Sequence, residues 1–174
     1  MDQTPNPHRR GGKIMLTIAW LLIMGGVYWF FSDWEAKQSN PNTARLLNLQ
    51  QGELTLTRNR AGHYVAAGEI NGRQVTFLLD TGATWVALPT GLARELGLKR
   101  GAAVTLQTAN GSAVGYRTRL DRVRLGPIEM RDVGALVADG MDADTVLLGM
   151  NFLKRVEFTQ RGEQLILRPA GAGR

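Results

Sequence analysis

The apolar residues of the chain follow two patterns, and the first is an unbroken run near the N-terminus. Residues 14–31, with the sequence IMLTIAWLLIMGGVYWFF, contain no charged side chain. As a helix with a rise of about 1.5 Å per residue, this run would be about 27 Å long, close to the roughly 30 Å of hydrocarbon in a bilayer. The pattern predicts a transmembrane anchor over residues 14–31.

The flanks of this run predict its orientation. Three basic residues lie in the segment 1–13, whereas the charges after the run are mixed. Because basic flanks stay in the cytoplasm, we expect a cytoplasmic basic tail at 1–13 and a periplasmic or otherwise extracytoplasmic location for all that follows, in a single-pass inner-membrane protein. The alternative is a cleaved signal peptide, but the run exceeds the usual apolar core of about 7–15 residues and no small-residue cleavage site follows.

The second pattern begins after a polar segment, residues 32–53, which we interpret as a tether. From about residue 54, short strand-like pieces alternate with turn signals. Asn71-Gly72 joins HYVAAGEI to RQVTFLL, and Asn-Gly is a strong hairpin signal because a type I′ turn needs positive φ at both central residues. A second Asn-Gly pair joins two more such pieces. The pattern predicts a mainly β domain over residues 54–170, a small barrel or sandwich.

Helix is predicted in only two short places within this domain. Thr90 can cap the segment GLAREL, and Gly97 follows it as a glycine suited to the end of a helix. The second segment is MNFLKR, which starts at Met150. We therefore expect short helices packed on a β framework.

Composition limits the chemistry that the domain can perform. The chain has no cysteine and only two histidines, His8 and His63, which excludes disulfides, thiolate nucleophiles and zinc sites built on cysteine or several histidines. The acidic stretch DGMDAD, residues 139–144, lacks the glycine at the sixth position and the glutamate at the twelfth position of a calcium-binding EF-hand loop, and we interpret it as a solvated loop. We expect no metal and no cofactor, so that chemistry must use carboxylates, hydroxyls or the backbone.

The net charge of +6 does not by itself indicate a nucleic-acid partner. The stretch RTRLDRVR, residues 117–124, contains four arginines, but it alternates as a strand does and is interrupted by Asp121. A nucleic-acid surface would combine a basic stripe with aromatic side chains. We interpret the stretch as the solvated face of a strand and expect no nucleic-acid partner.

Asp80 lies where an acid is unexpected, directly after the apolar strand-like run in FLLDTGATWVAL. A strand that turns at an acid presents the carboxylate at a rim or an interface. Gly82 allows close approach of a ligand or a second loop, and the hydroxyls of Thr81 and Thr84 can brace the turn. For the bare tripeptide Asp-Thr-Gly, the alternative is an Asx turn in which Asp80 bonds only its own backbone.

Three segments in this order resemble the aspartic proteases. FLLDTGATWVALP resembles their active-site loop, and VLLGMNFL, residues 146–153, resembles their second signature of two apolar residues, a glycine and a short helix. The segment VTLQTANGSAVGYR lies between them, where such enzymes carry a flap. Over roughly residues 54–168 the chain is similar to bacterial retropepsin-like proteases with a single N-terminal membrane anchor. This resemblance implies a retropepsin-like acid-protease barrel with short helices.

The resemblance also implies roles for individual residues. Asp80 would be catalytic, with the rest of the active-site loop at Thr81, Gly82, Ala83 and Thr84. Asn110 and Gly111 would lie near the tip of the flap, and the residues supporting the active-site loop would be Leu147, Leu148 and Gly149. Trp85 is bulkier than expected after such a loop, which should affect its substrate side.

The resemblance implies a homodimer, because the chemistry of this class needs two carboxylates and the chain contains one Asp-Thr-Gly. In a two-fold dimer Asp80 would meet Asp80 of the partner, and Thr81 would brace the two loops. One Asp80 would act as base on a water, and the other, protonated, would polarise the scissile carbonyl. The C-terminal hairpin predicted over residues 156–168 lies where this fold commonly places dimer strands.

The sequence thus predicts a membrane-anchored aspartic endopeptidase acting on peptide or protein substrates. Two alternatives remain open. The first is a catalytically silent, membrane-tethered module that binds a peptide or protein by strand addition on the same fold. The second is a domain that stays monomeric and latent until the tether is processed.

Overall fold

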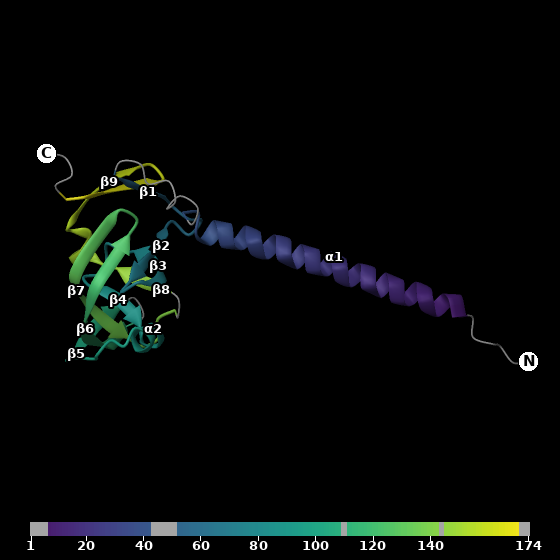
Figure 1. Ribbon diagram of the computed structural model, residues 1–174, viewed down its shortest axis with the longest axis horizontal. Coiled ribbons are helices and arrows are strands. Elements are labelled where there is room, and N and C mark those ends of the chain that lie inside the picture. Colours follow the sequence, from purple (N-terminus) through teal and green to yellow (C-terminus); the bar gives the residue numbers. More distant parts are fainter. Residues whose placement is uncertain (1–6, 43–51, 109–110, 143–144, 171–174) are drawn as a thin grey trace, which may run out of the picture. The chain divides into compact units, whose positions relative to one another are not determined.

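The structure, a computed structural model, describes residues 7–42, 52–108, 111–142 and 145–170. The chain divides into two units, Met1–Gln38 and Ser39–Arg174. The first unit contains all but the last residue of helix α1 (Pro7–Ser39), a single helix of 33 residues. The second contains all the strands (Figure 1).

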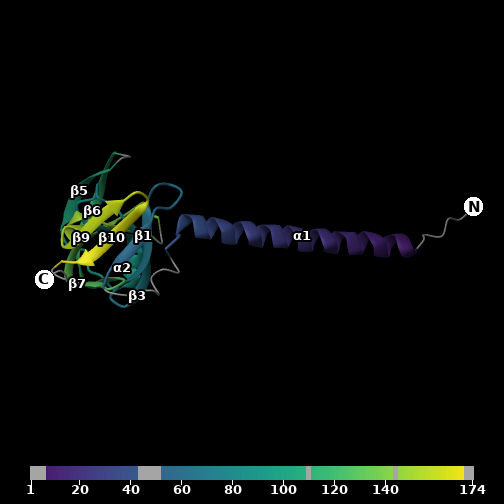
Figure 2. The same ribbon diagram turned by 90° about the horizontal axis from the view of Figure 1, so that it is seen from above.

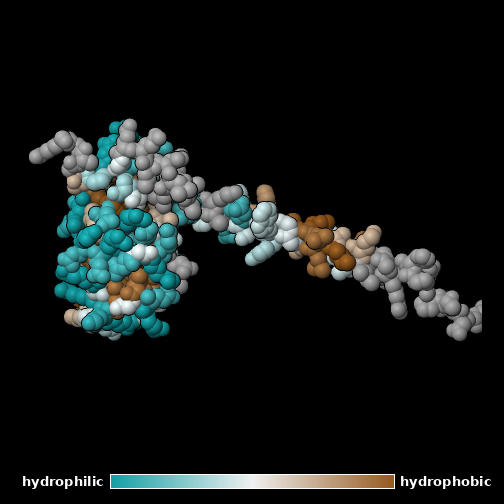
Figure 3. Space-filling model, viewed as in Figure 1, coloured by the Kyte–Doolittle hydropathy of each residue, from teal (hydrophilic) through white to brown (hydrophobic). Residues whose placement is uncertain are grey.

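Helix α1 is long and apolar enough to cross a membrane. Its candidate span, Met15–Glu35, has 21 residues, and 0% of its apolar window is buried by the described part of the chain. Figure 3 shows the apolar surface as a brown segment of the helix. Large side chains such as Trp20 and Trp29 are 60% and 75% exposed. The hydrocarbon of a bilayer would cover this apolar surface, whereas exposing it to water would be unfavourable in free energy.

The second unit consists mainly of strands. These are β1 (Leu54–Thr57), β2 (Tyr64–Ile70), β3 (Arg73–Leu79), β4 (Val86–Pro89), β5 (Ala103–Thr108), β6 (Gly111–Leu125), β7 (Ile128–Ala138), β8 (Thr145–Leu148), β9 (Val156–Arg161) and β10 (Gln164–Pro169). The two helices of this unit are α2 (Thr90–Glu95) and α3 (Met150–Leu153).

Six of these strands close into a barrel. They follow one another in the order β2-β3-β8-β4-β7-β6, and β6 returns to β2. The closing seam consists of the pairs Glu69↔Arg124 and Ile70↔Val123, and the side chains of Glu69 and Arg124 also form an ion pair at 2.5 Å. Two of the pairings are parallel, β3 with β8 and β4 with β7. The predicted mainly β barrel with short helices is confirmed.

A three-stranded sheet lies beside the barrel, in the order β1-β10-β9. Strands β9 and β10 form an antiparallel hairpin whose last pair is Arg161↔Gln164, and Gly162 turns it with a φ of +56°. The hairpin predicted for the C-terminal segment is confirmed. Strands β1 and β9 are the two outer strands of this sheet in the described chain.

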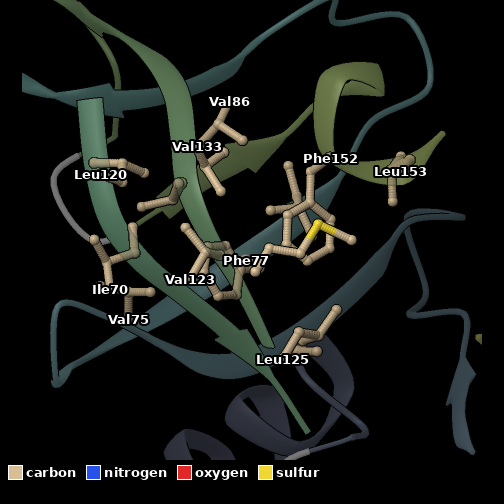
Figure 4. Close-up of a cluster of buried hydrophobic side chains, with 14 of the residues drawn as sticks. Ile70, Val75, Phe77, Val86, Leu120, Val123, Leu125, Val133, Phe152 and Leu153 are labelled. Carbon is tan, nitrogen blue, oxygen red and sulfur yellow. The ribbon is translucent and has the colours of Figure 1, made fainter. Parts of the chain in front are cut away.

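The barrel encloses one hydrophobic core. Phe77 of β3, Leu120 and Val123 of β6, and Phe152 of α3 are each 0% exposed and belong to the cluster in Figure 4. Burying each such side chain contributes roughly 1.5–3 kcal/mol to the free energy of unfolding. Because α3 contributes Phe152 to this cluster, the short helix is fixed to the barrel although it has only 4 residues.

The predicted turn between β2 and β3 is confirmed. Asn71 has a φ of +52° and Gly72 a φ of +87°, as a type I′ turn requires, and the strands pair directly on either side at Ile70↔Arg73. The side chain of Asn71 also accepts a hydrogen bond from the N–H of Arg122 at 2.9 Å. The asparagine thus connects the turn to β6 as well as tolerating its positive φ.

Of the two sequence signals for the ends of α2, the glycine at the C-terminal end is confirmed and the threonine cap at the N-terminal end is wrong. Gly97 follows the helix with a φ of +65°, and the N–H groups of Gly97 and Leu98 donate to the carbonyls of Arg94 and Ala93, which closes a Schellman motif. Thr90, however, does not cap the helix, because the cap position is Pro89 and no side chain caps it.

The hydroxyl of Thr90 has other partners. It donates to Oδ1 of Asp139 at 2.5 Å and accepts from Arg100 at 2.6 Å. Two charged partners brought in by the fold compete successfully with the local backbone N–H, which is why the local cap signal was misleading.

The second unit begins before its first strand. Asn42 is a fully buried polar residue at 0% exposure. Its side-chain amide donates to the carbonyls of Thr57 (2.9 Å) and Val65 (2.8 Å), and its oxygen accepts the N–H of Thr57 at 2.7 Å. The segment that the sequence predicts as a tether therefore contains a residue fastened to the β domain.

The hairpin of β5 and β6 extends from the barrel (Figure 2). Strand β6 has 15 residues, and its first six pair with β5, from Thr108↔Gly111 to Ala103↔Tyr116. Gly111 begins β6 at the tip with a φ of +107°. Asn110 lies outside the described residues.

Candidate active site

Asp80 follows β3 at the point where the strand leaves the barrel. Its N–H donates to the carbonyl of Leu148 at 3.3 Å, so the chain at Asp80 is still held to the end of β8. Its Oδ1 accepts the N–H of Gly82 at 2.8 Å, and its carbonyl accepts the N–H of Ala83 at 3.3 Å. The turn is therefore an Asx-type turn, in which the carboxylate is orientated by its own loop.

The carboxylate retains capacity for a further partner. The Asp80 residue is half-buried, and within the described ranges Oδ1 bonds Gly82 while Oδ2 accepts no hydrogen bond. An ionised carboxylate can accept about four hydrogen bonds, so the turn leaves most of this capacity unused. The Asx turn thus orientates the Asp80 carboxylate but leaves most of its hydrogen-bonding capacity unused.

The remaining residues of the loop 80–84 face outwards. Thr81, Gly82 and Thr84 are exposed, and Ala83 is half-buried. The hydroxyl of Thr81 has no hydrogen-bond partner among the residues that the structure describes. The loop therefore combines a half-buried carboxylate with exposed threonine side chains.

The other side of the loop is held by α3. The carbonyls of Ala83 and Thr84 accept the N–H groups of Met150 (2.8 Å) and Asn151 (2.9 Å). The first N–H groups of a helix have no partner within the helix, so here the loop supplies their acceptors. Loop and helix therefore satisfy each other's backbone and form one rigid junction.

Gly149 allows this junction to form. A Cβ atom at this position would lie 2.4 Å from the carbonyl oxygen of Trp85 and 2.8 Å from that of Ala83. Only a residue without a side chain permits such an approach. The other two residues predicted to support the loop belong to β8: Leu148 is 0% exposed in the core, and Leu147 is half-buried and pairs with Leu78 and Ala87.

The side chain of Asn151 completes the junction. Its oxygen accepts the N–H of Val86 at 2.9 Å, and its amide donates to the carbonyl of Gly134 at 2.6 Å. Val86 is 0% exposed, so its N–H has no access to water as an alternative partner. Asn151 thus ties the strand after the active-site loop to both α3 and β7.

This arrangement can hold one carboxylate rigidly at an open surface. Asp80 is the only acid in the loop 80–84. A single carboxylate can accept or donate one proton, whereas activation of a water together with polarisation of a carbonyl requires two groups in different protonation states.

Comparison with known proteins identifies the family. The model of the family described as gag-polyprotein putative aspartyl protease matches residues 66–155. The match runs from β2 to the end of the α3 junction, more than half of the 174 residues. The chain belongs to this aspartyl protease family.

Two relatives of the chain are both described as uncharacterized. A protein in the cobV 5′ region of Sinorhizobium sp is 32% identical over 176 residues, which cover 92% of this chain and 76% of the relative. A protein of Rickettsia prowazekii (strain Madrid E) is 30% identical over 119 residues, which cover 67% of this chain and 51% of the relative. The chain therefore spans about half the length of the second relative.

A solved structure supports the fold of this aspartyl protease family member. The crystal structure of a retropepsin-like aspartic protease from Rickettsia conorii is 33% identical, covers 67% of this chain and 89% of that chain, and superposes with a TM-score of 0.57. The expected retropepsin-like fold is confirmed.

Sequence analysis of this retropepsin-like chain did not single out Asn151. A polar, uncharged residue between Met150 and Phe152 in a short apolar helix was the available signal. Its two partners are 65 and 17 residues away in sequence, and a local sequence pattern cannot predict contacts at that separation.

Proposed function

We propose that this retropepsin-like chain is an aspartic endopeptidase whose active site forms when two copies bring their Asp80 residues together. The observation that supports this most directly is the active-site loop itself. It is fastened to β8 and α3 by backbone hydrogen bonds, while Asp80 keeps a carboxylate oxygen that accepts no hydrogen bond from the described residues. One chain supplies one such carboxylate, and a symmetric partner supplies an identical one.

The two carboxylates divide the chemistry between them. Held close together they share one proton, because two adjacent negative charges repel each other. The ionised Asp80 removes a proton from a water, whose oxygen attacks the carbonyl carbon of the peptide bond. The protonated Asp80 donates its hydrogen to the carbonyl oxygen and stabilises the tetrahedral intermediate. The C–N bond then breaks as the nitrogen takes up a proton from the dyad, while a hydroxyl of the intermediate returns a proton to the dyad, which leaves a carboxylic acid and an amine.

Two surfaces support assembly into a homodimer. The exposed hydroxyl of Thr81 has no partner in the described chain, which fits a role in bracing the second loop. Strand β9 is an outer strand, and its Phe158 is 45% exposed. An open strand edge with an exposed aromatic side chain favours pairing with another copy.

We propose that the protease is anchored in the inner membrane. Residues 14–31 would span the bilayer, with the tail 1–13 in the cytoplasm, and the tether 32–53 would lead to a protease domain at 54–170 in the periplasm. The length and apolar surface of α1 support the span, and the basic residues before it support the orientation. Fusion of a reporter enzyme that is active only in the cytoplasm to the C-terminus should give no signal, whereas a signal would contradict the orientation.

The decisive experiment compares the full chain in detergent micelles with its Asp80→Asn variant on a diverse peptide mixture, from about pH 4 to 7. We expect cuts from the wild type and none from the variant, with products read by mass spectrometry. Asp142→Asn is a matched control: Asp142 is exposed and lies outside the active-site loop, and asparagine can also accept its bond from the hydroxyl of Thr145.

The outcomes separate the alternatives. Equal cleavage by wild type and Asp80→Asn would exclude the proposed dyad. A folded wild-type dimer that makes no cuts would favour the silent peptide-binding module. A monomer without activity, measured by analytical ultracentrifugation, would favour the latent form.

A further inference from the structure

A large hollow of the protease domain is lined by residues other than Asp80. It has a volume of about 610 Å³ and lies between β6, β7 and the segment after α2. Its apolar lining includes Trp85, Leu96, Leu98 and Leu136. We call this hollow the Trp85 cleft.

Trp85 connects the cleft to the active-site loop. Its side chain is 42% exposed, and its ring lies over Gly134, where a Cβ atom would be 3.0 Å away. The backbone of the same residue packs against Gly149 at the junction with α3. A large aromatic ring that is half-exposed in a hollow is typical of a binding surface.

The rim of the cleft is strongly cationic. Four basic residues and one acid, Asp121, line it. Arg100 and Arg119 each have a carboxylate partner, whereas Lys99 and Arg117 have none in the described part of the chain. These two side chains are exposed and available to a ligand.

The positive charge continues into a second hollow. This hollow, of about 310 Å³, shares Asn71 and Asp121 with the Trp85 cleft and adds Arg122 and Arg131. The basic stretch 117–124, which the sequence predicts to be a solvated strand face, thus contributes residues to two hollows that share part of their lining. A ligand with several negative charges along an extended chain would match this surface.

We propose that the Trp85 cleft binds an acidic segment of the protein substrate, with glutamate or aspartate side chains next to apolar ones, outside the residues that are cut. This rests on the proposed endopeptidase function. The apolar floor accepts leucine-like or aromatic side chains, and Lys99 and Arg117 bind the carboxylates. A nucleic acid fits less well, because the floor offers a single aromatic ring on which bases could stack, beside leucine side chains.

Binding is tested without catalysis, in the full-length Asp80→Asn chain in detergent micelles. The chain has four tryptophans, so replacing Trp20, Trp29 and Trp34 by phenylalanine leaves Trp85 as the sole reporter. The probe is a dodecapeptide of alternating glutamate and leucine, and its control has glutamine in place of glutamate. We expect a saturable change in Trp85 fluorescence with the acidic peptide, and about tenfold or more weaker binding of the glutamine peptide.

Charge reversal locates the site. The double variant Lys99→Glu with Arg117→Glu should weaken binding of the acidic peptide about tenfold or more. The matched control is Lys154→Glu with Arg155→Glu, an exposed pair outside the cleft that makes the same change in net charge. It should bind as the parent does. Thermal unfolding by circular dichroism checks that both variants are folded.

Several results would overturn the proposal. Equal binding of the two peptides would remove the charge argument, and equal weakening by both double variants would place the peptide elsewhere. Tighter binding of dodecathymidylate than of the acidic peptide would assign the cleft to nucleic acid. The two proposals fail separately. If the chain binds the acidic peptide but the wild type never cleaves, peptide binding in the Trp85 cleft stands and the endopeptidase function fails. If the wild type cleaves but the chain does not bind the acidic peptide, the endopeptidase function stands and the cleft proposal fails.

Discussion

The active-site loop and the β5–β6 hairpin are two parts of the same domain, but they are held in different ways. The carbonyls of Ala83 and Thr84 bond to α3, and Asn151 adds two side-chain hydrogen bonds beside them. The β5–β6 hairpin is paired along its strands, and its side chains there are mostly exposed. The loop depends on particular residues elsewhere in the chain, whereas the hairpin depends on strand pairing that many sequences can provide.

The strongest test of this contrast is Gly149→Ala. The new methyl group would overlap the carbonyls of Trp85 and Ala83, so the junction must shift. We expect a loss of about 3 kcal/mol in the free energy of unfolding and a loss of proteolysis. Urea unfolding of the full chain in detergent measures the first effect.

The control is Gly91→Ala. Gly91 lies in α2, and a Cβ atom there would have nothing within 4 Å. We expect unchanged stability or a gain of up to about 1 kcal/mol, because alanine favours helix. If both variants unfold at the same urea concentration, the tight junction at Gly149 is not what holds the loop.

A smaller effect is expected from Asn151→Ala. The variant leaves the buried N–H of Val86 and the carbonyl of Gly134 without partners. The expected cost is about 1–3 kcal/mol in the free energy of unfolding, again measured in urea. Gln107→Ala in β5 is the comparison in the hairpin, because Gln107 only accepts a bond from the exposed hydroxyl of Ser112. It should change stability by less than about 0.5 kcal/mol, and a larger cost than for Asn151→Ala would reverse the contrast.

The smallest effect on stability is expected from Val114→Thr in the hairpin. Val114 is 53% exposed on β6, so the nearly isosteric change should alter the free energy of unfolding by less than about 0.5 kcal/mol. If the hairpin closes over substrate, loss of one apolar methyl contact should raise KM for peptides about fourfold. Steady-state kinetics measures this, and an unchanged KM would mean that Val114 does not contact the peptide.

The parts of the fold that the sequence predicted correctly depend on local geometry. Asn71, Gly72 and Gly97 have positive φ angles that few other residue types tolerate. Their positions in the sequence therefore predict a turn and the end of a helix. The alternating strands predicted a β domain, and the family resemblance supplied the barrel that alternation alone left open between barrel and sandwich.

The parts that the sequence did not predict depend on contacts between distant residues. Thr90 has the local features of a helix cap, but Asp139 and Arg100 reach its hydroxyl only in the folded barrel. Asn42 and Asn151 look like ordinary polar residues, and their partners lie 15 to 65 positions away. The location of Asp80 was apparent from the sequence, while the means by which its loop is held was not.

The buried side chain of Asn42 has a consequence for the lifetime of the domain after release from α1. A cut within the last turn of α1 would free a soluble fragment that keeps Asn42 bound to Thr57 and Val65. A cut a few residues later would free a fragment whose first strand loses these bonds and whose edge is open to further degradation. The position of a single cleavage would thus determine how well a released domain resists further degradation.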